Sequence, residues 1–413
     1  MDETERMGRA ICARVDELAR ITEDPPRLTR VFLSPEMRRA ADLVLAWMRE
    51  AGMAAHMDAI GNVVGRYEGT KPGLPALVLG SHLDTVRDAG KYDGMLGVVT
   101  AIACVGRLAH EDVRLPFAVE VIGFADEEGV RFGATMLGSR AVAGTFDRAL
   151  LKLKDRAGTS LADAMREFGL DAARIGEAAK PRPGILAYAE LHIEQGPVLE
   201  AKDLPVGTVT SINGAARFEV EVAGEAGHAG TVPMDRRHDA LACAAECVLA
   251  VEARCASEPG LVGTVGRIEA SPGAINVIPG AARFTIDLRA PDDGQRGRAA
   301  ADLEARFAEI AQRRATRVEM RRVHGLQAAP CAPWLMEQVD RAIAAEGIEP
   351  FRLPSGAGHD GMAMIALADI CMIFVRCVRG ISHNPAEAIS VRDAGTGFHV
   401  LLRFIKGFAP KPA

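Results

Sequence analysis

The sequence predicts an α/β protein in which a central mixed sheet, flanked by helices, is interrupted by a smaller inserted domain. Apolar runs of strand length alternate with helical patterns in the first half of the chain, and this texture resumes after Pro333. Between these parts the pattern changes near residue 210, and residues 218–222 alternate strictly between apolar and polar. With 413 residues, the chain is too long for one ordinary core. We therefore expect a main domain over 1–210 and 330–413 and an inserted domain over 211–329.

The main domain is expected to begin with two helices followed by buried strands. Helical periodicity covers 5–21, and a second helix starts with Ser34 as its N-cap and Pro35 at its first position. Fully apolar runs of strand length follow, and such strands are typical of a sheet covered on both faces. The expected strands are 60–67, 76–79 and 117–124, with a helix over 94–108.

The inserted domain is expected to be a small α+β sandwich of ferredoxin-like type. Residues 218–222 alternate as a half-exposed strand should, and 281–289 do the same. The order is strand, helix, strand, strand, helix, strand, which is the ferredoxin-like order. The other expected elements are helices over 236–255 and 297–313 and strands over 261–268 and 317–322.

Composition excludes several classes of partner. The net charge of -6 and the pI near 6.0 argue against a nucleic-acid-binding surface. We find no basic, apolar leader and no uninterrupted run of about 18 apolar residues, so we expect neither export nor a membrane span. The eight cysteines are scattered without metal-binding spacing and are best interpreted as reduced core residues. We therefore expect a cytoplasmic protein.

Side chains suited to metal binding follow apolar strands at three places. His82 would lie at the C-terminal rim of its strand, where open α/β sheets bind ligands, and Asp84 could hold the other imidazole nitrogen. Asp93 precedes a glycine at the start of a helix. Residues 126–128 are three consecutive carboxylates, which repel one another unless solvent or cations neutralise them. The structural alternatives are a histidine satisfied in a turn, a capping aspartate and a solvated loop.

Two more histidines complete a candidate ligand set. His192 shares a strand face with Glu194 and Gly196, and His383 lies in a loop near the end of the chain. Each histidine alone is a weak signal. Three histidines and two carboxylates together would supply two divalent ions that share one bridging aspartate. The set is His82, Asp93, Glu128, His192 and His383.

The surrounding motifs give these residues a specific context. The chain carries GSHLDT, KYDG, ADEEGVRFG, HIEQGPVLE, GHAGTVPM, INVIPG and ISHNPAE, which are spread over nearly its whole length. With these motifs it resembles the M20 superfamily of metal-dependent peptidases and amidases, in the hydantoinase/carbamoylase branch. That branch includes N-carbamoyl-L-amino acid hydrolases, beta-ureidopropionase-type enzymes and allantoate amidohydrolases.

The resemblance implies a catalytic domain with two divalent metal ions, Zn or else Mn, Co or Ni. One ion would be held by His82, Asp93 and His192, and the other by Asp93, Glu128 and His383. Glu127 would act as general base and acid on the attacking water, with Asp84 as a further catalytic residue. The peptide between Asp93 and Gly94 is expected to be cis.

The resemblance also implies that the inserted domain is a lid and a dimerisation domain, which predicts a homodimer. Arg289 would grip a substrate carboxylate, and Asn276 would add amide hydrogen bonds. His228 would stabilise the tetrahedral oxyanion, and in relatives this histidine can come from the partner subunit. Further substrate contacts are expected from Gln195, Gly358 and His359.

The implied activity is hydrolysis of the carbamoyl or ureido C–N bond of a small carboxylate, allantoate or an N-carbamoyl-L-amino acid, with release of ammonia and CO2. The segments around Gly358 and His383 look somewhat more like those of allantoate amidohydrolases. Arg376 and Arg379 either favour an anionic substrate or lie on the surface.

Three other functions remain open at this point. The first is an M20 dipeptidase or aminoacylase, and the second is a binding protein descended from such enzymes. The third is a cysteine hydrolase that pairs Cys371 or Cys377 with His383.

Overall fold

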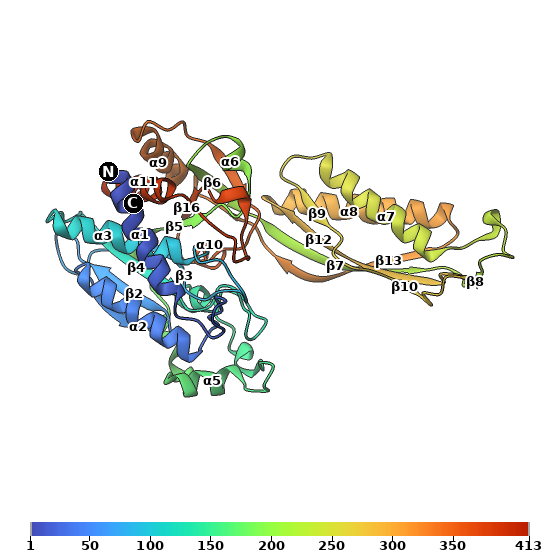
Figure 1. The fold of residues 1–413 in the computed structure, drawn as a ribbon, viewed down its shortest axis with the longest axis horizontal. Coiled ribbons are helices and arrows are strands. Elements are labelled where there is room, and N and C mark those ends of the chain that lie inside the picture. The colour runs from blue at the N-terminus through green and yellow to red at the C-terminus, as the bar shows by residue number, and fades with distance from the viewer. Residues whose placement is uncertain (1, 412–413) are drawn as a thin grey trace. The chain divides into compact units, whose positions relative to one another are not determined.

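A nine-stranded mixed sheet is the main feature of the computed structural model, which describes residues 2–411 (Figure 1). Its strand order is β1-β2-β4-β3-β5-β16-β6-β14, with β15 paired to β6. Neighbours among β4, β3, β5 and β16 run parallel, whereas the pairs β1–β2, β2–β4, β16–β6 and β6–β14 are antiparallel. The predicted mixed sheet is therefore confirmed. The strands are β1 Ala54–Met57, β2 Val63–Tyr67, β3 Ala76–His82, β4 Ala118–Phe124, β5 Ile185–Ile193, β6 Val206–Ile212, β14 Ala329–Pro330, β15 Arg352–Ser355 and β16 Ile370–Val375.

Helices flank this sheet, as the sequence predicted. The predicted cap of α2 is present, because the Ser34 hydroxyl accepts a hydrogen bond from the Met37 N–H at 3.0 Å and Pro35 follows it. Helix α3 packs against β3 and β5, and α11 packs against α1 and β16. The helices are α1 Glu3–Ala19, α2 Pro35–Glu50, α3 Met95–His110, α4 Leu137–Val142, α5 Leu161–Phe168, α6 Val198–Ala201, α9 Pro333–Ala345, α10 Gly361–Met364 and α11 Val391–Gly407. Among residues 2–411, none of the helices combines the length and the apolar character needed to cross a membrane.

The strand expected over 60–67 starts only at Val63, and a side chain explains the delay. Asp58 accepts hydrogen bonds from the N–H groups of Ile60, Gly61 and Asn62 at 2.9–3.0 Å. A short acidic side chain that binds the following backbone in this way makes a turn in place of a strand.

The chain divides into two compact units. The first ends at Thr210 and resumes over Cys331–Leu353 and from Ala357, and the second comprises Ser211–Pro330 and Pro354–Gly356. The segment Pro354–Gly356 joins the second unit because the Asn213 N–H donates to the Ser355 carbonyl at 2.9 Å and Arg289 donates to the Gly356 carbonyl at 2.8 Å. The boundaries predicted from the sequence did not include this segment in the inserted domain.

The second unit contains a five-stranded antiparallel sheet, a two-stranded sheet of β8 and β11, and two long helices. The strand order is β10-β12-β7-β13, and β9 also pairs with β12. Helices α7 and α8 cover one face of this sheet, and a separate hydrophobic core fills the space between them (Figure 1). The elements are β7 Gly214–Ala223, β8 Gly227–His228, α7 Ala240–Ala256, β9 Val262–Thr264, β10 Ile268–Ser271, β11 Val277–Ile278, β12 Ala281–Ala290, α8 Asp293–Arg313 and β13 Arg317–Leu326.

The single strand expected over 261–268 is wrong, because two short strands occupy this part of the chain. Thr264 pairs with Asp287 and Ile268 pairs with Phe284. Three residues therefore stand between the paired positions on one strand and two on the other. One extra residue interrupts the ladder in this way.

A fully buried arginine ties the loop after β3 to the N-terminal helix. Arg30 has 0% of its surface exposed. Its guanidinium donates to the carbonyls of Leu83 (2.9 Å), Leu18 (3.0 Å) and Ile21 (2.9 Å). Its backbone N–H donates to the Thr85 hydroxyl at 2.9 Å, and its carbonyl accepts from the Thr85 N–H at 3.0 Å. The position of residues 83–85 therefore depends on Arg30.

We expect Arg30→Met to destabilise the protein strongly, because the Leu83 and Ile21 carbonyls would lose this donor. The Leu18 carbonyl would also lose it but would keep the Ile21 N–H. At about 1–3 kcal/mol for each unsatisfied group, a loss of about 3 kcal/mol or more in the free energy of unfolding is expected. Urea unfolding measures this change. Arg39→Met, at an exposed position of α2, is the control and should leave the midpoint unchanged. An Arg30→Met protein that unfolds at the wild-type midpoint would contradict the assignment.

Candidate functional site

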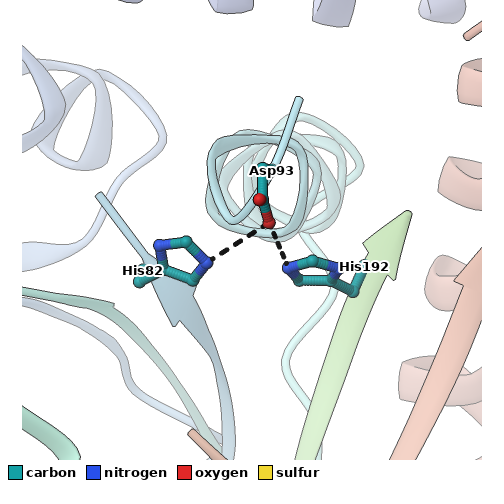
Figure 2. Close-up of side chains that lie close together, drawn as sticks. All are labelled: His82, Asp93 and His192. Atoms are coloured by element: carbon teal, nitrogen blue, oxygen red, sulfur yellow. Dashed lines mark ion pairs between the residues drawn. The ribbon is translucent and has the colours of Figure 1, made fainter. Parts of the chain in front are cut away.

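Two histidines at the ends of neighbouring parallel strands point at one buried carboxylate (Figure 2). His82 is the last residue of β3, His192 is the penultimate residue of β5, and Asp93 stands two residues before α3. The Nε2 atoms of His82 and His192 lie 3.6 and 3.2 Å from Asp93 Oδ1. All three side chains are buried. The predicted strand-end placement of His82 is confirmed.

The hydrogen bonds of the two imidazole rings leave both Nε2 atoms on the side of Asp93, and the Gly94 N–H also donates to His192 Nε2 at 3.2 Å. Nδ1 of His82 lies 3.0 Å from the Asp84 carbonyl, and Nδ1 of His192 lies 2.9 Å from the Ile193 carbonyl. A carbonyl oxygen only accepts, so each Nδ1 carries the proton, and in the neutral ring the Nε2 lone pair faces Asp93. A positive charge between these nitrogens and the carboxylate would be favourable, and this donor set suits a divalent ion.

A proton on His82 also supplies positive charge beside these carboxylates. Burial alone would lower the pKa of His82, but the carboxylates of Asp84 and Asp93 raise it well above its usual value. The surroundings thus favour positive charge at this point, whether a proton or a metal ion supplies it.

A second candidate ligand group uses the other oxygen of Asp93. His383 Nε2 lies 3.1 Å from Asp93 Oδ2 and 3.4 Å from Glu128 Oε1. These three residues could hold a metal ion, as could His82, Asp93 and His192. Each oxygen of Asp93 faces a different group, which is the arrangement that a bridging carboxylate needs. Burial raises the pKa of Glu128 to about 7, so a cation would be required to keep this side chain fully charged at neutral pH.

Glu127 lies beside both groups, and together with His82 and Glu128 it forms a further set of residues that could hold a metal ion. Its side chain is buried, and burial raises its pKa well above the usual value; neighbouring carboxylates raise the pKa further, although His82 opposes them. A buried carboxyl group with a raised pKa is suited to accept and return a proton near neutral pH. A Cβ atom at Gly358 would lie 3.5 Å from Glu127 Oε1, which makes Gly358 its neighbour.

Asp84 positions the loop that carries Glu127 and Glu128. Its Oδ1 accepts from the Glu127 N–H at 2.9 Å, and its Oδ2 accepts from the Glu128 N–H at 3.1 Å. The His82 ring is held mainly by the Asp84 backbone carbonyl, since the Asp84 carboxylate lies farther away, at 3.5 Å. The sequence had suggested only the contact of Asp84 with His82.

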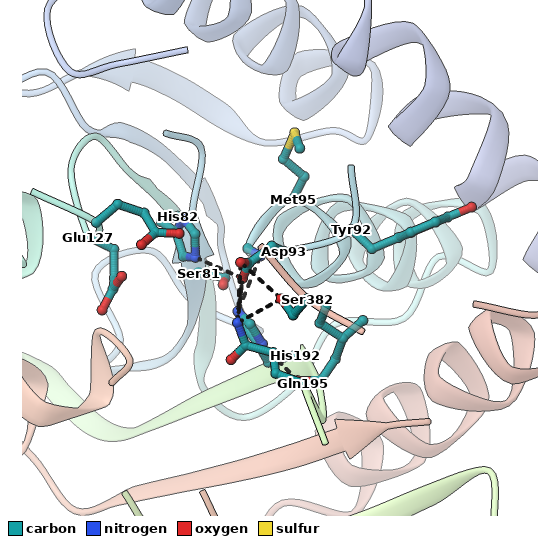
Figure 3. A network of polar contacts seen from close by, with 12 residues as sticks. Ser81, His82, Tyr92, Asp93, Met95, Glu127, His192, Gln195 and Ser382 are labelled. Carbon is teal, nitrogen blue, oxygen red and sulfur yellow. Dashed lines mark hydrogen bonds and ion pairs between the residues drawn. The ribbon is translucent and has the colours of Figure 1, made fainter. Parts of the chain in front are cut away.

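Gln195 and His359 both lie within the site. The Gln195 amide donates to both oxygens of Asp93 at 3.2 Å and to the Ser382 hydroxyl at 3.1 Å (Figure 3). The His359 ring centroid lies 4.5 Å from that of His192. Burial lowers the pKa of His359 well below its usual value, so its imidazole is neutral. In this structure, therefore, Gln195 supports the aspartate and His359 packs behind a candidate ligand.

The other three predicted substrate residues lie in the second unit. His228 on β8 and Asn276 are neighbours, because the Ala229 N–H donates to the Asn276 carbonyl at 3.0 Å and β8 pairs with β11. Arg289 on β12 donates to the two oxygens of Asp287 at 3.0 and 3.2 Å. A carboxylate bound by Arg289 would have to compete with Asp287 for this guanidinium.

Two local expectations differ from the structure. The Asp93–Gly94 peptide is trans, since the cis peptide bonds among residues 2–411 are Pro25–Pro26 and Ser271–Pro272. Gly94 makes the turn by adopting a φ of 71°, and a Cβ there would lie 2.6 Å from the His82 ring, so only glycine fits. Arg376 is engaged by Asp393 at 3.0 and 3.1 Å and by Asp203 at 2.8 Å, which indicates an anchoring role for this arginine.

Some contributors to the site were not singled out from the sequence. Ser382 and Glu387 stand within the motif ISHNPAE, so their position near His383 was visible but their contacts with residues 92–93 were not. Glu190, buried below His192, accepts from the hydroxyls of Ser81 and Tyr188 at 3.0 and 2.9 Å. No pattern in the sequence distinguishes it from an ordinary strand residue.

Comparisons with known proteins agree with the motifs. The model of peptidase family M20/M25/M40 matches residues 78–407. An N-carbamoyl-L-amino acid amidohydrolase of Geobacillus stearothermophilus is 41% identical over 95% of this chain and 97% of its own length. A probable allantoate deiminase of Oryza sativa subsp. japonica is 40% identical over 95% of this chain and 87% of its own length.

A solved structure extends the similarity to the whole fold. A hydantoinase/carbamoylase family amidase from Burkholderia multivorans matches with a TM-score of 0.92 at 32% identity, and the match covers 98% of both chains. Sequence relatives and structural neighbours therefore converge on one group of enzymes. The chain belongs to peptidase family M20/M25/M40, in its hydantoinase/carbamoylase branch.

Proposed function

We propose that the protein is a two-metal amidohydrolase that cleaves the carbamoyl or ureido C–N bond of a small carboxylate, allantoate or an N-carbamoyl-L-amino acid, and releases ammonia and CO2. The observation that carries this proposal is the convergence of three histidines on the two oxygens of Asp93, with Glu127 close by. The relatives named N-carbamoyl-L-amino acid amidohydrolase and allantoate deiminase support the substrate class.

The metal part of the proposal assigns one ion to His82, Asp93 and His192 and a second to Asp93, Glu128 and His383. Nitrogen and oxygen ligands of this kind accept Zn, Mn, Co and Ni. When bound, a pair of such ions lowers the pKa of water and polarises the substrate carbonyl.

The protein's own residues would handle the proton. Glu127 takes a proton from the attacking water and returns it to the leaving nitrogen, which its buried position and raised pKa favour. Asp84 fixes Glu127 through the hydrogen bonds to the loop amides and so acts on the reaction by positioning. Gly358 leaves room beside the Glu127 carboxylate for a reacting group.

The second unit is proposed to be an inserted ferredoxin-like domain that serves as a lid and dimerises the protein. Its sheet order β10-β12-β7-β13, with α7 and α8 in the two crossovers, supports the ferredoxin-like description. Arg289 and Asn276 would bind the substrate carboxylate, and His228 would stabilise the oxyanion. Closure of such a lid would exclude water from the reaction.

The alternative with a cysteine nucleophile is disfavoured by burial. Cys371 and Cys377 are buried, and burial raises the pKa of Cys377 to about 11. A thiol with a raised pKa is a poor nucleophile at neutral pH. A dipeptidase or aminoacylase activity, or a binding function alone, would be recognised by the absence of ammonia release from ureido substrates.

Wild-type protein loaded with Mn or Zn should release ammonia from allantoate, ureidoglycolate or N-carbamoyl-amino acids when these are assayed as a panel. Glu127→Gln should reduce kcat by at least about a hundredfold on the preferred substrate, because the proton acceptor is lost while the shape is kept. Near-normal turnover by Glu127→Gln would show that another group is the base. The absence of turnover on every member of the panel by metal-loaded wild type would contradict the proposed activity.

Metal affinity should weaken as the pH is lowered from about 8 to about 6. The imidazoles and Glu128 must be deprotonated to bind a cation, so protons compete with the metal and binding releases protons. Calorimetric titration of the apoprotein with Mn in buffers of different ionisation enthalpy measures both effects. An affinity that does not change with pH would argue against these ligands.

A further inference from the structure

The carboxylate of Glu387 connects two chain segments that lie about 290 positions apart in the sequence. Its Oε1 accepts hydrogen bonds from the N–H groups of Tyr92 at 2.8 Å and Asp93 at 3.1 Å. Its Oε2 accepts from the Ser382 hydroxyl at 2.9 Å. The residue is 3% exposed, so water does not replace these bonds easily. One oxygen of this buried side chain therefore binds the backbone of residues 92–93, and the other binds the loop residue Ser382.

The segment around Glu387 is itself closely packed. The Glu387 N–H donates to the Asn384 carbonyl at 3.0 Å, and the Ala386 N–H donates to the Asn384 side chain at 2.9 Å. On the opposite side, a Cβ atom at Gly90 would lie 2.2–2.4 Å from atoms of the Glu387 side chain. Such a separation is far below van der Waals contact, so Glu387 can keep its place only while residue 90 is glycine.

Glu387 is connected to two of the three candidate ligands of the second ion, with Asp93 on one side and His383 on the other. On one side it binds the amide of Asp93. On the other it binds Ser382, the residue before His383, and Ser382 Oγ also lies 3.4 Å from Asp93 Oδ2. Figure 3 shows Ser382 and Gln195 grouped around Asp93. His383 needs such support because its side chain is 51% exposed, whereas His82 and His192 are held inside the sheet.

We propose that Glu387 is a positioning residue that fixes Asp93 and His383 relative to each other and thereby sets the affinity of the second ion site. The proposal rests on the proposed two-metal function. In this role Glu387 does not bind the metal itself but orients residues that do. Loss of such a residue typically costs about 10–100-fold in metal affinity.

The test is a calorimetric titration of the full-length apoprotein with Mn. His383→Ala serves as the reference for loss of the second site, and His192→Ala for loss of the first. Glu387→Ala should weaken the second site by at least about tenfold, and its titration should resemble that of His383→Ala. Glu387→Gln should remain close to wild type, because its amide oxygen still accepts the two N–H groups and Ser382 Oγ can accept from its NH2 group.

Two further variants separate positioning from a general loss of stability. Gly90→Ala leaves the carboxylate in the chain but displaces it, and should weaken the second site as Glu387→Ala does. Glu200→Ala is the control for loss of a carboxylate near this loop, since exposed Glu200 accepts the Arg379 N–H at 2.9 Å. Glu200→Ala should keep both sites.

The possible outcomes separate the two proposals. If wild-type protein does not bind two Mn ions, the two-metal function fails. If wild type binds two ions and Glu387→Ala keeps its second-site affinity, the positioning role fails. The positioning role also fails if Glu387→Gln binds Mn at the second site as weakly as Glu387→Ala does. If Glu387→Ala does not fold, the Mn affinity of Gly90→Ala tests the positioning role in its place. A second-site affinity equal to that of wild type in Gly90→Ala would overturn the inference.

Discussion

The buried carboxylate of Asp93 is the group on which the rest of the site depends. Three imidazole nitrogens lie 3.1–3.6 Å from its two oxygens, one pair on one oxygen and the third nitrogen on the other. Within residues 2–411, the ion pairs to Asp84, Asp93 and Glu128 all come from histidines. Burying several carboxylates beside neutral rings costs several kcal/mol per charge, unless cations compensate them. This electrostatic demand links the fold to metal chemistry.

The ends of parallel strands and buried hydrogen bonds between loops hold these charged groups in place. Strands β3, β4, β5 and β16 run parallel, so the segments after them begin at one edge of the sheet and carry the ligands there. Loops alone would not hold those ligands accurately. Asp84 binds the amides of Glu127 and Glu128, and Arg30 binds the carbonyl of Leu83, the residue after His82. The charged groups that surround the ligands thus also determine the positions of the ligands.

Much of the architecture could be predicted from the sequence because it depends on local rules, and the candidate ligands could be named from their motifs. Strand-length apolar runs, the Ser34 cap and polar residues after strands are patterns that depend only on neighbouring residues in the sequence. The partners of the site side chains depend on residues far away in the sequence. Asp84 lies beside the His82 imidazole, as expected, but its carboxylate also binds amides 43 and 44 positions later. Arg376 is bound by Asp203 and Asp393. The expected cis peptide after Asp93 was wrong, since Gly94 makes the turn with a positive φ.

Anomalous X-ray diffraction from crystals of the Mn- or Zn-loaded protein tests the central claim most directly, because it locates the ions without reference to activity. Our account predicts two peaks about 3.5–4 Å apart, one next to each oxygen of Asp93, with His82 and His192 at one peak and His383 and Glu128 at the other. A crystal at saturating metal concentration with no peak at Asp93, or with ions bound only away from these histidines, would contradict it.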